Sequence, residues 1–148
     1  MNAKNRSLVA TALLVVAVVL LLLQRWLLAR TPIGIALQVL AAALMLWARL
    51  TFGMRSFHAS ANPTAGGLIT AGPYRYWRHP IYAAVLLFVW SGVLSQGVPP
   101  SIMALGLAAF ATAMTAVRIQ AEEQLLHASM PEYAAYAART RRFIPFIF

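Results

Sequence analysis

Residues 7–23 carry no charged side chain and, apart from Ser7 and Thr11, consist entirely of Leu, Val and Ala. A helix of about 20 apolar residues is long enough to cross the hydrocarbon core of a bilayer, where each backbone N–H and C=O group must be hydrogen-bonded within the segment. Basic residues precede the run, as in a signal peptide, but Arg25 and Trp26 follow where a small-residue cleavage site would stand. The run therefore predicts a retained transmembrane helix.

Three further apolar runs predict further membrane-spanning helices, at residues 33–48, 81–98 and 101–117. Of the 148 residues, 61% are hydrophobic and 10% are charged, whereas about a quarter of the residues in a soluble domain carry a charge. Pro99 and Pro100 leave so short a link that the last two helices must be antiparallel neighbours. We therefore expect an all-α polytopic membrane helix bundle of about four spans. Residues 143–148 are apolar and could dip into the membrane, although they are too few to cross it.

The basic residues are distributed unevenly over such a bundle. Ten of the twelve Lys and Arg residues fall on one side, and Arg25 and Arg30 fall on the other. The positive-inside rule then places both termini and the loop 49–80 in the cytoplasm, at the inner membrane if the source is a prokaryote. The net charge of +9 is spread among apolar runs rather than gathered on one face, so we expect no nucleic-acid partner. There is no cysteine, and the three histidines lack metal-ligand spacing, so we expect no metal site.

The most polar stretch between the apolar runs is residues 72–82, which read Gly-Pro-Tyr-Arg-Tyr-Trp-Arg-His-Pro-Ile-Tyr. Pro80 has no N–H to donate and suits the first turn of the third span, which would hold Arg78 and His79 at the membrane boundary. A single Arg, Trp or Tyr in such a place is usually an interfacial anchor. The combination with His79 indicates a functional site.

All three acidic residues follow the fourth span, at Glu122, Glu123 and Glu132. A carboxylate at the end of a membrane helix needs a partner, and Arg118 lies one turn before Glu122 on the same helical face. Adjacent helical residues point about 100° apart, so we expect one of the two neighbouring glutamates to face a given pocket. The loop 49–80 and this tail lie on the same side and should meet in a polar pocket. The spacing alone is compatible with a salt bridge or with a site for a ligand that is both cationic and anionic.

The order of these segments resembles one family. The segments are Gly72-Pro73-Tyr74-(x3)-Arg78-His79-Pro80-x-Tyr82, a hydrophobic hairpin, Glu122-Glu123, Tyr133-(x2)-Tyr136 and Arg142-Phe143-Ile144-Pro145. Together they resemble the isoprenylcysteine carboxyl methyltransferase family, a relative of the phospholipid N-methyltransferases, over about residues 66–146. The resemblance implies a single membrane domain, 1–148, with N-terminal spans and a loop in 1–65 and a methyltransferase core in 66–148. It also implies an S-adenosylmethionine cofactor bound by the loop and the C-terminal helices.

By position, the resemblance implies cofactor contacts from Gly66, Gly67, Leu68, Ile69, Tyr74, His79, Pro80, Ile81, Tyr82 and Glu122. It also implies catalytic roles for Arg118 and Glu122, with Arg118 next to the substrate. The chemistry of these residues agrees with an S-adenosylmethionine cofactor. A carboxylate pairs with the sulfonium and the ammonium of the cofactor, and aromatic side chains pack against its adenine. The sequence departs from the family pattern at Ala84, where Gly is frequent, and at Pro131, in a turn that usually contains Gly. The choice between Glu122 and Glu123 as the cofactor carboxylate therefore stays open.

The methyl acceptor also stays open. It could be an isoprenylcysteine-type carboxylate, another lipid acid, a lipid amine or a thiol. A carboxylate needs no general base and could be oriented by Arg118, whereas an amine would need a base such as His79 or Glu123. The expected partners are membrane lipid and a lipophilic or lipidated substrate. The alternatives are a nicotinamide-dependent membrane reductase of the sterol-reductase type and a small four-span transporter. Neither fits as well, because the loop offers few groups for nucleotide phosphates and the spans contain no central acid.

Overall fold

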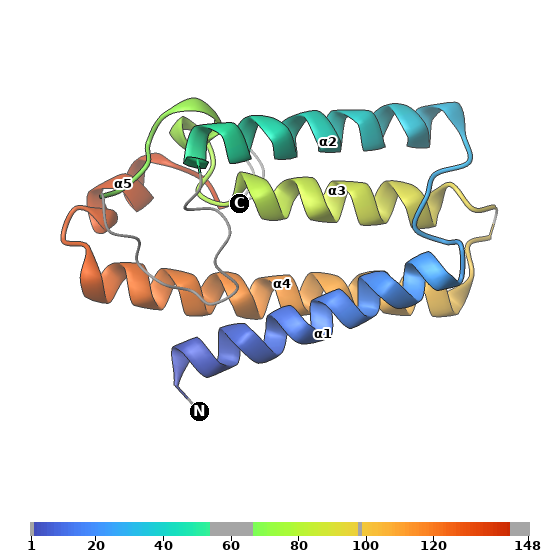
Figure 1. Ribbon diagram of the computed structural model, residues 1–148, viewed down its shortest axis with the longest axis horizontal. Helices are drawn as coiled ribbons and strands as arrows, with labels where there is room; N and C mark the ends of the chain where they lie inside the picture. Colours follow the sequence, from blue (N-terminus) through green and yellow to red (C-terminus); the bar gives the residue numbers. More distant parts are fainter. Residues whose placement is uncertain (1, 54–66, 98, 143–148) are drawn as a thin grey trace.

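The computed structural model describes residues 2–53, 67–97 and 99–142. The regular elements in these ranges are α1 (Ala3–Leu23), α2 (Pro32–Phe52), the 3-10 helix η2 (Gly72–Arg75), α3 (Pro80–Leu94), α4 (Ile102–Ser129) and α5 (Tyr133–Arg139). The helices α1, α2, α3 and α4 lie side by side, with α5 at one end of the bundle and the α1–α2 link at the other (Figure 1). The predicted all-α, polytopic architecture is confirmed.

Capping residues mark the starts of α1 and α2. The Asn2 side chain accepts a hydrogen bond from Asn5 N at 2.8 Å and caps α1. Thr31 caps α2 by accepting from Gly34 N at 3.2 Å, and Pro32 occupies the first turn, where no N–H is needed. These capping residues explain why both helices begin slightly before the apolar runs themselves.

Three helices, α1, α2 and α4, are long and apolar enough to cross a membrane. The third predicted span is shorter than expected, because α3 has 15 residues and ends at Leu94 rather than near residue 98. Its length is about 22 Å, against about 30 Å for a typical hydrocarbon core. The helix ends there because the side chains of Ser95 and Gln96 both donate to Gly92 O and turn the chain.

The helix α4 is longer than the predicted fourth span and continues without a break to Ser129. The segment from Arg118 to Ser129, which follows the predicted fourth span, is therefore a continuation of the same helix. As a consequence, Arg118, Glu122 and Glu123 are held on one rigid helix. Pro131 lies just beyond its end, and α5 begins two residues later, at Tyr133.

The most extensive helix contacts join α1 to α4 and α2 to α3. The α1 residues that face α4 recur every three or four positions, and they are Ser7, Ala10, Leu14, Ala17 and Leu21. Small residues of α4, including Ala104, Ala108 and Ala111, are fully buried. Small side chains let membrane helices approach closely. The helices α3 and α4 run antiparallel and touch each other, as the short Pro99-Pro100 link predicts (Figure 1).

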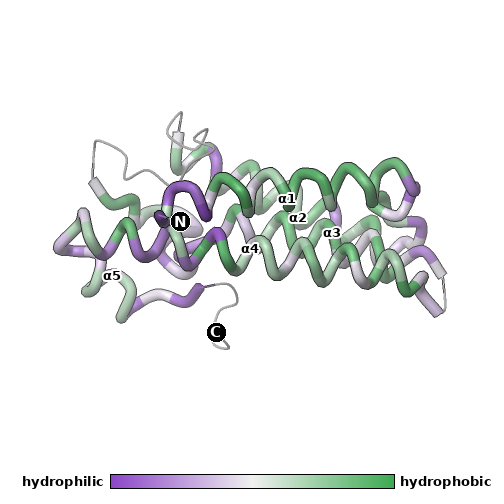
Figure 2. Tube along the Cα trace, turned by 90° about the horizontal axis from the view of Figure 1, so that it is seen from below, coloured by the Kyte–Doolittle hydropathy of each residue, from purple (hydrophilic) through white to green (hydrophobic). Residues whose placement is uncertain are grey.

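The outer surface of the bundle is apolar along the helices and polar towards the ends. Leucines and valines of α1 and α2 are largely exposed, and Figure 2 shows hydrophobic residues along the middle of the bundle with hydrophilic residues towards the ends. A soluble protein does not leave so much contiguous apolar surface in contact with water. The surface therefore matches a bundle that is surrounded by lipid.

Candidate active site

The loop before α3 and the segment after α5 are joined through their backbones at one end of the bundle. Arg78 N donates to Arg141 O at 2.7 Å, and Arg141 N donates to Tyr76 O at 3.1 Å. His79 N donates to Arg142 O at 3.3 Å. This short parallel pairing brings together two segments that are more than sixty positions apart in the sequence, as the predicted meeting of loop and tail requires.

The Arg78 side chain fastens the loop to both C-terminal helices. Its Nε donates to Glu123 Oε1 at 3.1 Å. Its Nη1 donates to the backbone oxygens of Ala137 at 2.5 Å and Thr140 at 2.6 Å. A guanidinium offers several donors in a rigid plane, so a single side chain can fix the relative positions of the loop, α4 and α5. The arginine that precedes His79 is therefore part of the site rather than an interfacial anchor.

Glu123 is the carboxylate with the larger number of basic partners. Besides Arg78, it accepts from Arg142 Nη2 at 2.9 Å and lies 3.3 Å from His79 Nε2. Its side chain is 10% exposed. A carboxylate with so little contact with water is stable only when its oxygens are well paired. Glu123 thus holds the loop and the tail against α4.

Glu122 faces a second set of partners. The Tyr82 hydroxyl donates to Glu122 Oε1 at 2.5 Å, and Arg118 Nε lies 3.2 Å from the same oxygen. Its Oε2 is 3.8 Å from His79 Nδ1. The buried imidazole therefore lies between Glu122 and Glu123, with one nitrogen towards each. The two glutamates thus meet different sets of partners, and the ring of His79 is the group that both of them approach.

The first helix also contributes to the cluster, which the sequence analysis did not predict. Arg118 Nη1 donates to Thr11 Oγ1, and Arg118 Nε donates to the Tyr82 hydroxyl. Thr11 in turn donates to Ser7 O at 2.7 Å. The Arg118 guanidinium also lies 5.6 Å from the centre of the Tyr82 ring. Ser7 and Thr11 are the two hydroxyl residues in an aliphatic run and lie four positions apart, so this spacing was the signal that could have revealed the contact.

Tyrosines form the aromatic part of the site. The Tyr136 hydroxyl donates to Tyr74 O at 2.7 Å, and the Tyr133 ring packs edge-on against His127. Burial raises the pKa of Tyr136 to about 12, despite the opposing effects of Arg78 and of a hydrogen bond with Thr140. Burial also raises the pKa of Tyr133 above its usual range. Both phenols are therefore protonated at neutral pH and able to donate a hydrogen bond, which Tyr136 does.

The buried donors at this end of the bundle include two, in Tyr133 and Trp77, without a partner among the described residues. Tyr133 is 1% exposed, and neither its hydroxyl nor the indole N–H of Trp77 makes a hydrogen bond with the described part of the chain. Most buried polar groups in proteins are paired, and each exception needs an explanation. Tyr133 begins α5, the helix that Arg78 joins to Glu123 through Ala137 O.

The remaining predicted cofactor residues lie in the first turn of α3 or precede it in the chain. Pro80 is buried in the first turn of α3, and Ile81 follows it, half-buried. Gly67 is exposed with a φ of 79°, and Leu68 and Ile69 are half-buried. Among the described residues, no hydrogen bond joins this segment to the carboxylates. Gly66 lies outside the described residues.

Part of the chain is similar to known proteins. Residues 33–128 match the isoprenylcysteine carboxyl methyltransferase (ICMT) family. The cobalt-zinc-cadmium resistance protein CzcN of Cupriavidus metallidurans is 40% identical over 81 residues, and the nickel-cobalt-cadmium resistance protein NccN of Alcaligenes xylosoxydans xylosoxydans is 37% identical over 79 residues. Each match covers 53% of this chain.

The matched segment spans about a third of the length of these two curated relatives, 35% of CzcN and 36% of NccN. No solved structure matches the chain. The family match covers well over half of the chain and includes His79, α3 with Tyr82, and almost all of α4 with Arg118 and both glutamates. With its apolar spans and this match, the chain is an integral membrane protein that belongs to the isoprenylcysteine carboxyl methyltransferase family.

Proposed function

We propose that this protein transfers the methyl group of S-adenosylmethionine to a lipophilic acceptor at the membrane boundary. The observation that carries the proposal is the single cluster formed by His79, Tyr82, Arg118 and Glu122, which meet at one end of an apolar helix bundle. Membership of a methyltransferase family supports methyl transfer. The cofactor, the acceptor and a cytoplasmic location of this end of the bundle are parts of the proposal.

The residues of the cluster fit the proposed cofactor. When bound, S-adenosylmethionine supplies an activated methyl group on a positively charged sulfur. Of the two carboxylates, Glu122 is the better counter-charge, because its side chain is 20% exposed against 10% for Glu123. Glu123 is already paired with Arg78, Arg142 and His79. We therefore assign Glu122 to the cofactor and Glu123 to holding the site together.

The two unpaired donors also fit a bound ligand. Leaving a buried donor without a partner costs about 1–3 kcal/mol. A ribose hydroxyl, an adenine nitrogen or the methionine carboxylate could accept from the hydroxyl of Tyr133 or the indole N–H of Trp77. Because Tyr133 begins α5, which Arg78 joins to Glu123, a ligand at the cluster could also satisfy this hydroxyl.

The charge of the cluster favours an acid as the acceptor. Three guanidinium groups, those of Arg78, Arg118 and Arg142, face two carboxylates, so one positive charge is in excess when His79 is neutral. An excess positive charge attracts a carboxylate and disfavours an ammonium. A carboxylate is also nucleophilic without a general base. We therefore propose a lipophilic carboxylic acid of the isoprenylcysteine type, ahead of a lipid amine or a thiol.

The chain itself orients the reactants and limits access of water. Tyr82 and Thr11 hold the Arg118 guanidinium from two sides, so Arg118 can present an acceptor carboxylate in one direction. Fixed orientation of two reactants accelerates a displacement reaction strongly, because little freedom remains to be lost in the transition state. The apolar helices next to the cluster suit the hydrocarbon part of the acceptor.

The metals in the names of the two relatives are not part of this proposal, because each match spans about a third of the relative. In the described ranges, no group of three or more His, Cys, Asp or Glu side chains could hold a metal ion.

The proposal is tested by calorimetric titration of the detergent-purified protein with S-adenosylmethionine. We expect saturable binding that is lost in Glu122→Gln and His79→Ala. Glu132→Gln is the matched control, because Glu132 is an exposed carboxylate at the start of α5 whose side chain makes no capping hydrogen bond. Absence of binding by a folded, monodisperse sample would refute the proposed cofactor, and a nicotinamide nucleotide would then be titrated.

The acceptor is tested separately, by following transfer of a radiolabelled methyl group. The acceptors to compare are an S-prenylated cysteine with a free carboxylate, a long-chain fatty acid, phosphatidylethanolamine and an alkyl thiol. We expect labelled product with the carboxylates. Label in phosphatidylethanolamine or the thiol alone would overturn the preference for an acid while leaving the methyltransferase assignment intact.

A further inference from the structure

The link between α1 and α2, at the end of the bundle away from the cluster, is held firmly by side chains of α2 and of the turn after α3. The buried Gln38 accepts from Ala29 N at 3.0 Å and donates to Leu27 O at 2.7 Å. Ser95 Oγ accepts from Arg30 N at 3.0 Å. These bonds pair backbone groups of the link that lie against the bundle, and they fix its conformation.

The same link lies directly against α3. Gln96 Nε2 donates to Leu28 O at 2.7 Å. A Cβ atom added to Gly92 would lie 1.9 Å from Leu27 O, so only glycine permits this approach of the two backbones. The link is therefore preorganised, and the direction of its side chains is set by the fold.

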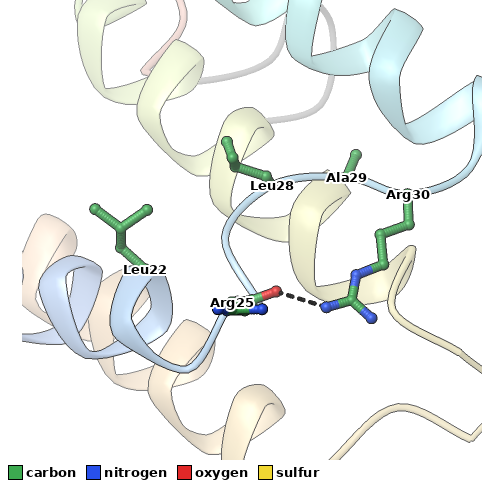
Figure 3. A pocket seen from close by; sticks show the side chains of 5 residues that line it. All are labelled: Leu22, Arg25, Leu28, Ala29 and Arg30. Carbon is green, nitrogen blue, oxygen red and sulfur yellow. Dashed lines mark hydrogen bonds between the residues drawn. The ribbon is translucent and has the colours of Figure 1, made fainter.

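The firmly held link presents two arginines around an open hollow. The hollow is lined by Leu22, Arg25, Leu28, Ala29 and Arg30 (Figure 3). The Arg30 guanidinium donates to Arg25 O at 3.3 Å and is thereby turned back over the link (Figure 3). The backbone of Arg25 has a φ of 59°, because Arg25 follows the C-cap of α1 in a Schellman motif. Arg25 N donates to Leu22 O at 2.9 Å and Trp26 N to Leu21 O at 2.8 Å, so this turn fixes the point at which Arg25 leaves the helix.

The charges of these two arginines are not balanced by acids of the chain. Both arginines are exposed, and the three acidic residues of the whole sequence, Glu122, Glu123 and Glu132, belong to the C-terminal half of α4 and the start of α5, at the other end. The flanks of the hollow are apolar, because Leu22 is 49% and Leu28 57% exposed. The helix α1 ends at Leu23, so the hollow lies where a membrane span ends and lipid headgroups begin.

We infer that this hollow binds the phosphate of an anionic membrane lipid, with Arg25 and Arg30 as its donors. Guanidinium groups recognise phosphate oxygens through paired, charge-assisted hydrogen bonds. The exposed leucines contact the acyl chains of the same lipid, which a free phosphate could not use. The site is independent of the proposed methyl transfer, since it lies at the opposite end of the bundle.

The inference is tested by native mass spectrometry of the detergent-purified full chain. The protein is incubated with an equimolar mixture of phosphatidylglycerol and phosphatidylcholine, and the lipids that remain bound are counted. We expect preferential retention of phosphatidylglycerol, reduced about tenfold or more in Arg25→Gln/Arg30→Gln. The matched control is Lys4→Gln/Arg139→Gln, which removes two exposed charges from the other end and should retain the lipid like the unaltered chain.

A second variant distinguishes loss of lipid binding from loss of folding. Arg25→Gly/Arg30→Gln relieves the left-handed conformation at position 25, so it should be at least as stable as the unaltered chain and still lose the lipid. Equal retention in all variants, or equal loss in the control, would overturn the inference. Displacement of phosphatidylglycerol by an equal concentration of inorganic phosphate would overturn the assignment to a lipid.

Discussion

The Tyr82 hydroxyl lies 2.5 Å from Glu122 Oε1 and accepts a hydrogen bond from Arg118, so one phenol of α3 contacts both members of an ion pair on α4. Arg118 and Glu122 are one helical turn apart and would pair without it. The Tyr82 phenol also fixes the position of the Arg118–Glu122 ion pair relative to α3, and hence relative to His79. The cluster is thereby tied to two helices instead of one.

Replacing Tyr82 with Phe removes this contact and leaves the Arg118–Glu122 pair in place. We expect kcat for methyl transfer to fall about tenfold to a hundredfold, because Arg118 is no longer held in one orientation. The thermal unfolding temperature should change little, because no buried charge loses its counter-charge. Tyr76→Phe is the control, since Tyr76 is exposed and should retain full activity. Equal kcat values in the two variants would contradict an orienting role for Tyr82.

Replacing Thr11 with Val tests whether the first helix takes part in the site. Val has a similar shape but removes the hydroxyl that accepts from Arg118. We expect kcat/KM for the acceptor to fall about tenfold while the affinity for S-adenosylmethionine is retained. Thr11→Ser keeps the hydroxyl and should restore most of the activity. If Ser and Val give the same kinetics, Thr11 serves only the packing of α1 against α4.

Two tyrosines of α5 should respond differently to removal of the hydroxyl. Tyr136→Phe loses the hydrogen bond to Tyr74 O and should lower the free energy of unfolding by about 1 kcal/mol. Tyr133→Phe removes a buried hydroxyl that has no partner in the described part of the chain, so stability should be unchanged or higher. The affinity for S-adenosylmethionine should nevertheless fall severalfold.

Thermal unfolding and calorimetric titration of the Tyr133→Phe and Tyr136→Phe variants check this pair of expectations. A clear loss of stability in Tyr133→Phe, with unchanged cofactor affinity, would show that its hydroxyl has a structural partner and does not meet the ligand.

Two glycines should differ in how far their replacement with Ala lowers the stability of the protein. Gly92→Ala places a methyl group against the backbone oxygen of Leu27 and should destabilise the protein by about 2 kcal/mol or more. Gly106→Ala places the same group in open space on α4 and should leave stability unchanged or slightly higher. Thermal unfolding in detergent measures both. Similar stability of the two variants would mean that the α1–α2 link is free to move away from α3.

Much of the fold could be predicted from local sequence. The apolar runs predicted helices α1 to α4, because a bilayer leaves few alternatives to a helix. Their ends were less predictable. The helix α4 passes beyond its apolar run, since Arg118 and the glutamates find partners at the end of the bundle, and α3 stops early, since Ser95 and Gln96 turn the chain. The segment 72–82 indicated the candidate site because polar residues are rare in this chain.

The sequence by itself determined that the chain is a helical membrane protein, and it placed His79, Tyr82, Arg118 and Glu122 in a candidate site. Only the tertiary structure decided that α1 pairs with α4, that Thr11 reaches Arg118 and that His79 lies between both glutamates. The physical reason is that apolar helices in lipid have no strong preference for one another. Their pairing depends on how closely small side chains let two particular faces approach, and a hydropathy pattern does not contain that information.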